Sequence, residues 1–197
     1  TNEGTNSGNI TITDAANGDI TLAANGTGLI KMTANSVTGD VIPGKLEGTN
    51  FDNSLLVGHS TSGTLSTSSN NTGVGIDTLN ALTSGDSNTA VGWDAGGAIT
   101  GGLTNTLIGA QAGKTLTGGD ANGCIGNQSG KVLTGSYNIC LGNEAGEALS
   151  SGSGNVLIGQ GIEAASSTGD QQLRIAGNND TSTVSWITGA SDGNLEV

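Results

Sequence analysis

Residues 105–121 read NTLIGAQAGKTLTGGDA, and this stretch holds every feature of a unit that the chain repeats. The unit opens with the pattern Asn-x-x-apolar-Gly, which recurs at spacings of 16 or 17 residues. Its copies begin at Asn71, Asn88, Asn105, Asn122, Asn138 and Asn155. One further step of 17 residues backward reaches Ser54. About seven copies therefore cover residues 54–170, and a fixed period of this kind predicts a solenoid.

Further columns of the repeat are equally regular. A small residue followed by Gly comes three residues after the strand-ending Gly, as in Ala95-Gly96 and Ala112-Gly113. An aliphatic residue followed by Thr or Ser comes next, and this column contains Leu82, Ile99, Leu116, Leu133 and Leu149. Each copy ends in a Gly-rich turn, so the repeat has a fixed corner after each short apolar segment.

These columns predict an all-β, parallel β-solenoid (a β-roll or β-helix) of about seven 17-residue coils. One short strand follows each Asn, and a second is expected around each Leu-Thr pair. Gly allows a positive φ at the corners, and each coil returns one layer up, about 4.8 Å along the axis. The Asn side chains then stack as a hydrogen-bonded ladder. Gly costs about 1 kcal/mol per helical position, which argues against helices.

The apolar strands also predict assembly. Residues 106–108, 139–141 and 156–158 are apolar on both faces, whereas a half-exposed strand alternates. One face lies inside the coil, and we expect the other to pack against copies of the same chain. Only 33% of residues are hydrophobic, and Gly, Thr, Asn and Ser make up more than half of the 197 residues. Since this composition cannot fill a compact core, we expect an elongated homotrimer.

The regions outside the repeat have other patterns. Residues 1–40 form an expected N-terminal β module, whose short strands recur every 10 residues between Asn-Gly turns. Residues 41–53 form a junction. Residues 171–197 are predicted as a C-terminal β cap, with strands at 172–175, 183–187 and 194–197. Trp186 is expected in the core of this cap.

The coil pattern resembles that of phage tail fibres and tailspikes, and it is similar to the heads of trimeric autotransporter adhesins. The stretch AANGDITLAANGTGLIKM at 15–32 looks like strand repeats of marine phage structural proteins. Residues 173–197 resemble the segment that precedes an endosialidase-type intramolecular chaperone. The resemblance implies a trimeric, host-attaching fibre segment in the virion, outside the cell. Its implied partners are other fibre or tail segments and a host-surface glycan or protein receptor. The alternatives are a tailspike polysaccharide depolymerase and a bacterial trimeric adhesin head.

Charge and composition argue against other classes of function. The net charge is −12 with only five basic residues, which argues against nucleic acid and anionic membranes as partners. No apolar run approaches the roughly 18 residues of a membrane-spanning helix, so membrane insertion is not expected. There is one His, no phosphate-binding loop and no acidic calcium loop. We therefore expect neither a metal nor a cofactor.

Carboxylates are the only candidate catalytic groups. Asp77 and Asp94 occupy one column about 4.8 Å apart, close to the carboxylate spacing of about 5–5.5 Å in retaining glycosidases. Their column also holds Ser60, Gln111, Gln128 and Glu144, so we interpret it as a solvated face, assign no catalytic residue and expect no enzyme. On this interpretation Gln111→Val is nearly silent, whereas Gly109→Val strains a corner.

Three residues in variable columns are candidates for receptor contact: Trp93, Tyr137 and His59. Exposed aromatic rings stack on sugars or on protein partners, and the alternative for Trp93 is a rim position over the trimer seam. Cys124 and Cys140 share the middle column of the strand. We expect them to be small core hydrophobes rather than a disulfide.

Overall fold

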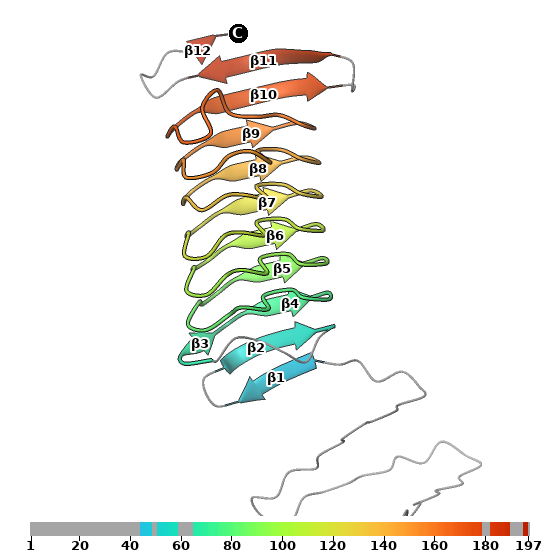
Figure 1. The fold of residues 1–197 in the computed structure, drawn as a ribbon, viewed down its shortest axis with the longest axis vertical. Helices are drawn as coiled ribbons and strands as arrows, with labels where there is room; N and C mark the ends of the chain where they lie inside the picture. Colours follow the sequence, from blue (N-terminus) through green and yellow to red (C-terminus); the bar gives the residue numbers. More distant parts are fainter. Residues whose placement is uncertain (1–43, 49–50, 59–64, 179–181, 190–194, 197) are drawn as a thin grey trace, which may run out of the picture. The chain divides into compact units, whose positions relative to one another are not determined.

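The computed structural model describes residues 44–48, 51–58, 65–178, 182–189 and 195–196, and within these it contains strands and turns but no helix. One short strand per coil follows each repeat's opening residue (Figure 1). These strands are β4 (Thr72–Val74), β5 (Thr89–Val91), β6 (Thr106–Ile108), β7 (Gly123–Ile125), β8 (Ile139–Leu141) and β9 (Val156–Ile158). Each pairs in parallel with the next, so the predicted parallel β-solenoid is confirmed.

Longer strands flank this stack. At one end β2 (Phe51–Val57) pairs in parallel with β4 and with the two-residue β3 (Ser68–Ser69), and antiparallel with β1 (Gly44–Gly48). At the other end β10 (Leu173–Asn178) lies parallel to β9. Antiparallel pairing then adds β11 (Thr183–Gly189) and β12 (Leu195–Glu196). The N-terminal module predicted for residues 1–40 lies outside the described residues.

The second strand predicted around each Leu-Thr pair is wrong. These residues follow a turn and lie in bends or irregular segments. Each layer is joined there by isolated bonds rather than by a ladder. The Thr83 N–H donates to the Thr100 carbonyl at 3.0 Å, and the Thr100 N–H donates to the Thr117 carbonyl at 2.9 Å. Short-range turn bonds such as Ile99 N–H to the Gly96 carbonyl, at 3.0 Å, keep this side of the coil curved.

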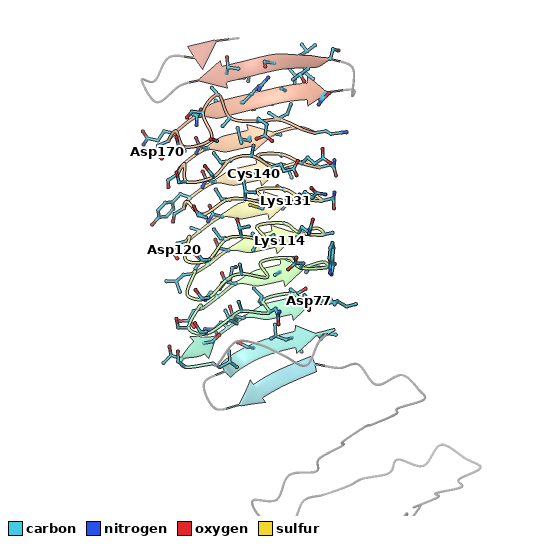
Figure 2. All side chains as sticks on the ribbon, in the orientation of Figure 1. Asp77, Lys114, Asp120, Lys131, Cys140 and Asp170 are labelled. Atoms are coloured by element: carbon cyan, nitrogen blue, oxygen red, sulfur yellow. The ribbon has the colours of Figure 1, made fainter. Side chains whose placement is uncertain are left out.

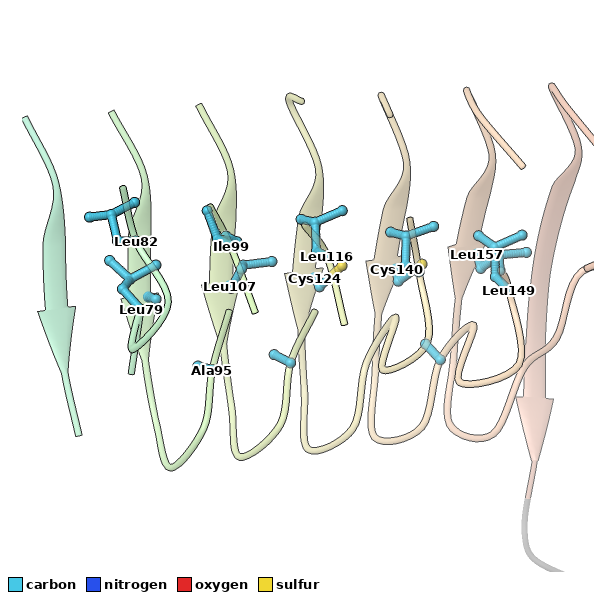
Figure 3. Packing of buried hydrophobic residues seen from close by; sticks show 14 of the residues in the cluster. Leu79, Leu82, Ala95, Ile99, Leu107, Leu116, Cys124, Cys140, Leu149 and Leu157 are labelled. Atoms are coloured by element: carbon cyan, nitrogen blue, oxygen red, sulfur yellow. The ribbon is translucent and has the colours of Figure 1, made fainter. Parts of the chain in front are cut away.

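Two facing rows of side chains make the core (Figure 3). The middle residue of each strand points inward, and this row contains Ala90, Leu107, Cys124, Cys140 and Leu157. The opposite row comes from the turn side and contains Leu82, Ile99, Leu116, Leu133 and Leu149. All ten are fully buried. Because successive side chains of a strand point to opposite faces, the first and third residues of each strand face outward.

Buried asparagines form a continuous hydrogen-bonded ladder beside this core. The Oδ1 of Asn88 accepts two hydrogen bonds from Asn105, one from its backbone N–H at 3.0 Å and one from its side-chain Nδ2 at 2.9 Å. The Asn105 Nδ2 also donates to the Gly119 carbonyl at 2.8 Å. The same bonds repeat from Asn71 to Asn155. The Ser54 hydroxyl starts the ladder, and the Gln172 amide, which the sequence pattern did not indicate, ends it.

Each regular coil turns at four positions of positive φ. Two are glycine columns, the strand-ending Gly such as Gly109 (φ 132°) and the Gly of the Ala-Gly pair such as Gly113 (φ 57°). The other two columns hold mostly residues other than Gly, for example Gln111 (φ 59°) and Tyr137 (φ 62°). The interpretation of the Gln111 column as an unconstrained solvated face is therefore wrong. We now expect Gln111→Val to be destabilising, because a β-branched residue tolerates this region less well than Gln.

One coil exchanges the usual positions of a core side chain and a glycine. Its strand has Gly73 where the other coils have Ala, Leu or Cys, and it has Leu79 (φ 51°) where four later coils have Gly. Both residues are buried. A Cβ at Gly73 would lie 3.5 Å from Leu79 Cδ1 and against Leu56 Cδ2. The Leu79 side chain, together with Leu56 of the preceding coil, thus fills the volume that Gly73 leaves empty.

We expect Gly73→Leu and Leu79→Gly to compensate each other. Gly73→Leu overpacks the coil and should cost about 1–3 kcal/mol. Leu79→Gly leaves a cavity and should cost about 2–5 kcal/mol, less the relieved φ strain. The double variant restores the arrangement of the other coils and should lose at least about 1 kcal/mol less than the two single losses combined. Urea unfolding of the four proteins measures this coupling, and additive losses would contradict the exchange.

Candidate interaction surfaces

An apolar column runs along the outward face of the strands. It consists of the third strand residues and their register partners, here called the outward ladder: Val57, Val74, Val91, Ile108, Ile125, Leu141, Ile158 and Ile175. Five of them, from Val74 to Leu141, are 36–42% exposed in the single chain. No member of the column is charged. Large contiguous apolar surface is uncommon on soluble monomers and marks an interaction site.

A second outward column runs beside this ladder. It contains Leu55, Thr72, Thr89, Thr106, Gly123, Ile139, Val156 and Leu173. Its side chains carry hydroxyls in three successive coils before Gly123 and are aliphatic in the layers after it. The outward face is therefore broader in aliphatic surface toward β10.

Trp93 lies at one edge of the outward face, directly after the strand-ending Gly92. Its side chain is 53% exposed, and Ile76, in the same column one coil earlier, is exposed as well. The next residue, Asp94, forms an ion pair with Lys114 at 2.9 Å. Trp93 is thus an exposed aromatic residue at the border between the apolar face and a polar edge.

Tyr137 lies at the opposite end of the strands. It immediately precedes Asn138 and β8, whereas Trp93 follows β5, and its side chain is 66% exposed. Leu103, an exposed residue two positions before Asn105, lies on this edge too. The structure therefore does not bring Trp93 and Tyr137 together into one site, and His59 lies outside the described residues.

Several carboxylates take part in bonds within the solenoid. Asp77 and Asp94 lie in a half-buried column of positive φ rather than on the solvated face that the sequence indicated, and Asp94 is held by Lys114. In another column, which the sequence pattern did not reveal, carboxylates cap the preceding coil. Asp86 accepts the Ser69 N–H at 2.6 Å and Asp120 accepts the Leu103 N–H at 2.8 Å. Figure 2 shows Asp120 and Asp170 along one edge of the stack, with Asp77 toward the other.

Lys131 joins two neighbouring coils. It donates to Gln128 in its own coil at 2.8 Å and to Glu147 in the next coil at 3.0 Å.

Burial raises the pKa of the Glu163 carboxyl. The backbone N–H of Ala148 donates a hydrogen bond to this carboxyl and acts in the opposite direction, lowering the pKa. These contacts give the charged groups structural roles between coils.

Cys124 and Cys140 lie next to each other in register as free, fully buried thiols. The hydrogen bond to the Cys140 side chain, together with burial, raises the pKa of the Cys124 thiol. A raised pKa disfavours the reactive thiolate. The expectation that both residues act as small core hydrophobes is therefore confirmed.

The expectation that Trp186 lies in a core is wrong. Its side chain is 58% exposed, and Val184 on the same face of β11 is also exposed. No described segment of this chain buries that face, since residues 182–186 are all exposed. The Trp186 ring lies over Gly177 and borders a shallow pocket of about 320 Å³, which Asn178, Ser182 and Val184 also line.

Within the described ranges, no group of three His, Cys, Asp or Glu side chains is placed to hold a metal ion. No helix long and apolar enough to cross a membrane occurs in the part of the chain that the structure describes. The chain matches no family model, no curated protein and no solved structure.

Proposed function

We propose that this chain is a structural and receptor-binding segment of a phage tail fibre or tailspike, and that it acts as a rigid homotrimer. The outward ladder is the observation that carries the proposal. The coil buries its own core, yet it leaves an uncharged aliphatic column along the strands. Three copies side by side would bury this column around a common axis.

The resemblance of the coil motif to phage fibres supports the biological setting. A fibre segment transmits force and presents its surface over a length, and stacked coils with a buried amide ladder suit that role. In this setting β10–β12 cap the solenoid, and further fibre segments adjoin its ends. The virion is then the expected location.

Light scattering coupled to size-exclusion chromatography tests the assembly. We expect a particle of three times the 19.1 kDa chain mass that does not depend on concentration in the micromolar range. A stable 19.1 kDa monomer would contradict the trimer.

Host contact is proposed for the exposed aromatic edges. Stacking of a sugar or side chain on an aromatic ring contributes about 0.5–1.5 kcal/mol, so Trp93→Ala or Tyr137→Ala should weaken binding about two- to tenfold. The assay is a panel of bacterial lipopolysaccharides and capsular polysaccharides, with Ile76→Ala beside Trp93 as the non-aromatic control. Release of new reducing ends during incubation would instead support a depolymerase. Equal binding by Trp93→Ala, Tyr137→Ala and the unmodified chain would remove both residues from the receptor site.

A further inference from the structure

The outward face changes composition halfway along the stack. Before Gly123 the first strand residue is Thr in three coils, so only the outward ladder is aliphatic there. After Gly123 both outward columns are aliphatic. The face then contains six aliphatic residues, here called the C-terminal face: Ile139, Leu141, Val156, Ile158, Leu173 and Ile175.

We infer that a second copy of this chain docks mainly on the C-terminal face, and that the break at Gly123 sets a parallel, unshifted register between copies. This inference rests on the trimer of the proposed function and adds which coils hold it and how the copies align. Burial of aliphatic area drives association, and the C-terminal face offers two such columns where the Thr coils offer one. Ile139 and Leu141 are exposed in the single chain, and the other four residues of the face are half-buried.

A copy of the same chain is the occupant that best fits this face. Neither outward column contains a charged residue. A basic partner attracted by the net charge of −12 would therefore have no acidic side chain to pair with on this face. A second copy presents the same columns at the same layer spacing. Every layer can therefore meet its identical layer over the full length of the stack, as a cyclic arrangement of parallel copies requires.

The composition of the columns distinguishes this alignment from others. In parallel, unshifted copies Thr106 meets Thr106 and Ile139 meets Ile139. Antiparallel copies would place the Thr coils against the C-terminal face, which desolvates hydroxyls on aliphatic surface. Gly123 leaves open space in the column, since a Cβ added there would have no heavy atom within 4 Å. If one copy were shifted by one coil, Gly123 would lie opposite Thr106 or Ile139 of the other copy instead of Gly123, and the mismatch would leave a void in the interface.

Matched Thr substitutions test which surface holds the copies together. Ile139→Thr keeps a β-branched residue in the strand, and Val132→Thr makes the same kind of change at a similarly exposed residue outside the face (48% and 38% exposed). We expect Ile139→Thr to raise the dissociation midpoint concentration of the trimer at least about tenfold, and Val132→Thr to change it less than about twofold. Fluorescence-detected sedimentation over dilution measures both.

Equal midpoints for Ile139→Thr and Val132→Thr in a trimeric protein would overturn docking on this face. A monomeric unmodified chain would instead overturn the trimer itself, so the two failures are distinguishable. A short bismaleimide tests alignment on Thr89→Cys and Ile139→Cys chains, since Cys124 and Cys140 are fully buried. We expect links between two copies of Thr89→Cys. Links that form only in mixtures of Thr89→Cys with Ile139→Cys chains would show an antiparallel arrangement and overturn the register.

Discussion

Gly109→Ala should destabilise each chain by about 2–6 kcal/mol, a large loss for the addition of a single carbon atom. Gly109 ends β6 at a φ of 132°, a conformation that L-residues rarely adopt. A Cβ there would meet the carbonyl group of Gly126 in the next coil and lie 2.9 Å from the Asn127 nitrogen. Because these are backbone atoms, only separation of the two coils relieves the clash.

The damage should spread beyond one coil, since each coil is stabilised by its neighbours alone. Gly118→Ala is the matched control, because a Cβ added there would have no heavy atom within 4 Å and its φ is outside the left-handed region. It should be neutral or stabilise the chain by up to about 1 kcal/mol through the unfolded state. Thermal and urea unfolding compare the two variants, and equal stabilities would show that the Gly109 corner is not the constraint described above.

Much of the solenoid follows from the repeat itself. A column that recurs every 16 or 17 residues must occupy the same place in each layer, so the position of the strands, the inward row and the asparagine ladder were predictable. Even Ser54 could be placed, because one step backward from Asn71 put a hydrogen-bonding side chain in the same column. The expected corners at Gly109 and Gly113 also have positive φ.

The non-glycine corners were not predictable from propensities. Gln111 and Tyr137 adopt a positive φ because bonds between coils hold them there. The Gln111 N–H donates to the Trp93 carbonyl at 2.8 Å, and the Tyr137 N–H donates to the Asp120 carbonyl at 2.8 Å. Such bonds offset the local strain, and only the stacking of layers reveals them. Because residue types vary in the Gln111 column, its sequence indicated an unconstrained, solvated face.

The outer surface was predictable in part. Apolar residues on both sides of a three-residue strand indicated an outward apolar face, and five members of its outward ladder, from Val74 to Leu141, are exposed in the single chain. Trp186 was misplaced because its alternating strand pattern shows that one face is apolar but not what covers that face. The aromatic candidates Trp93 and Tyr137 were expected to be exposed, and they are, but sequence could not show that they lie at opposite edges of the strands.

Asn105→Ala should destabilise each chain by about 3–6 kcal/mol, because it removes a central, fully buried member of the ladder. The substitution deletes four hydrogen bonds, two donated by the Asn105 Nδ2 and two accepted by its Oδ1. It leaves the Asn122 N–H and the Gly119 carbonyl without their ladder partner inside the solenoid. Each buried polar group that loses its partner costs about 1–3 kcal/mol.

A graded series tests whether the hydrogen bonds, rather than the side-chain volume, cause this loss. Asn105→Ser should fall between Ala and the unmodified chain, because a hydroxyl in this column can accept the next backbone N–H, as Ser54 does at 2.7 Å. Asn127→Ala, an exposed change one coil later, should stay within about 0.5 kcal/mol of the unmodified chain.

Asn105→Asp separates the roles of donor and acceptor at nearly constant volume. An ionised carboxylate still accepts from Asn122, but it faces the Asn88 Oδ1 and the Gly119 carbonyl with no proton to donate. The folded state therefore favours the protonated acid, which raises the pKa of the introduced carboxyl above its unfolded value of about 3.9. The stability that protonation contributes is fully present below that unfolded pKa and is lost as pH rises through the folded pKa. Urea unfolding at about pH 4 and about pH 8 should show the gap between Asn105→Asp and the unmodified chain widening at the higher pH. A gap that does not change with pH would mean that the Asn105 amide donates no essential hydrogen bond to the ladder.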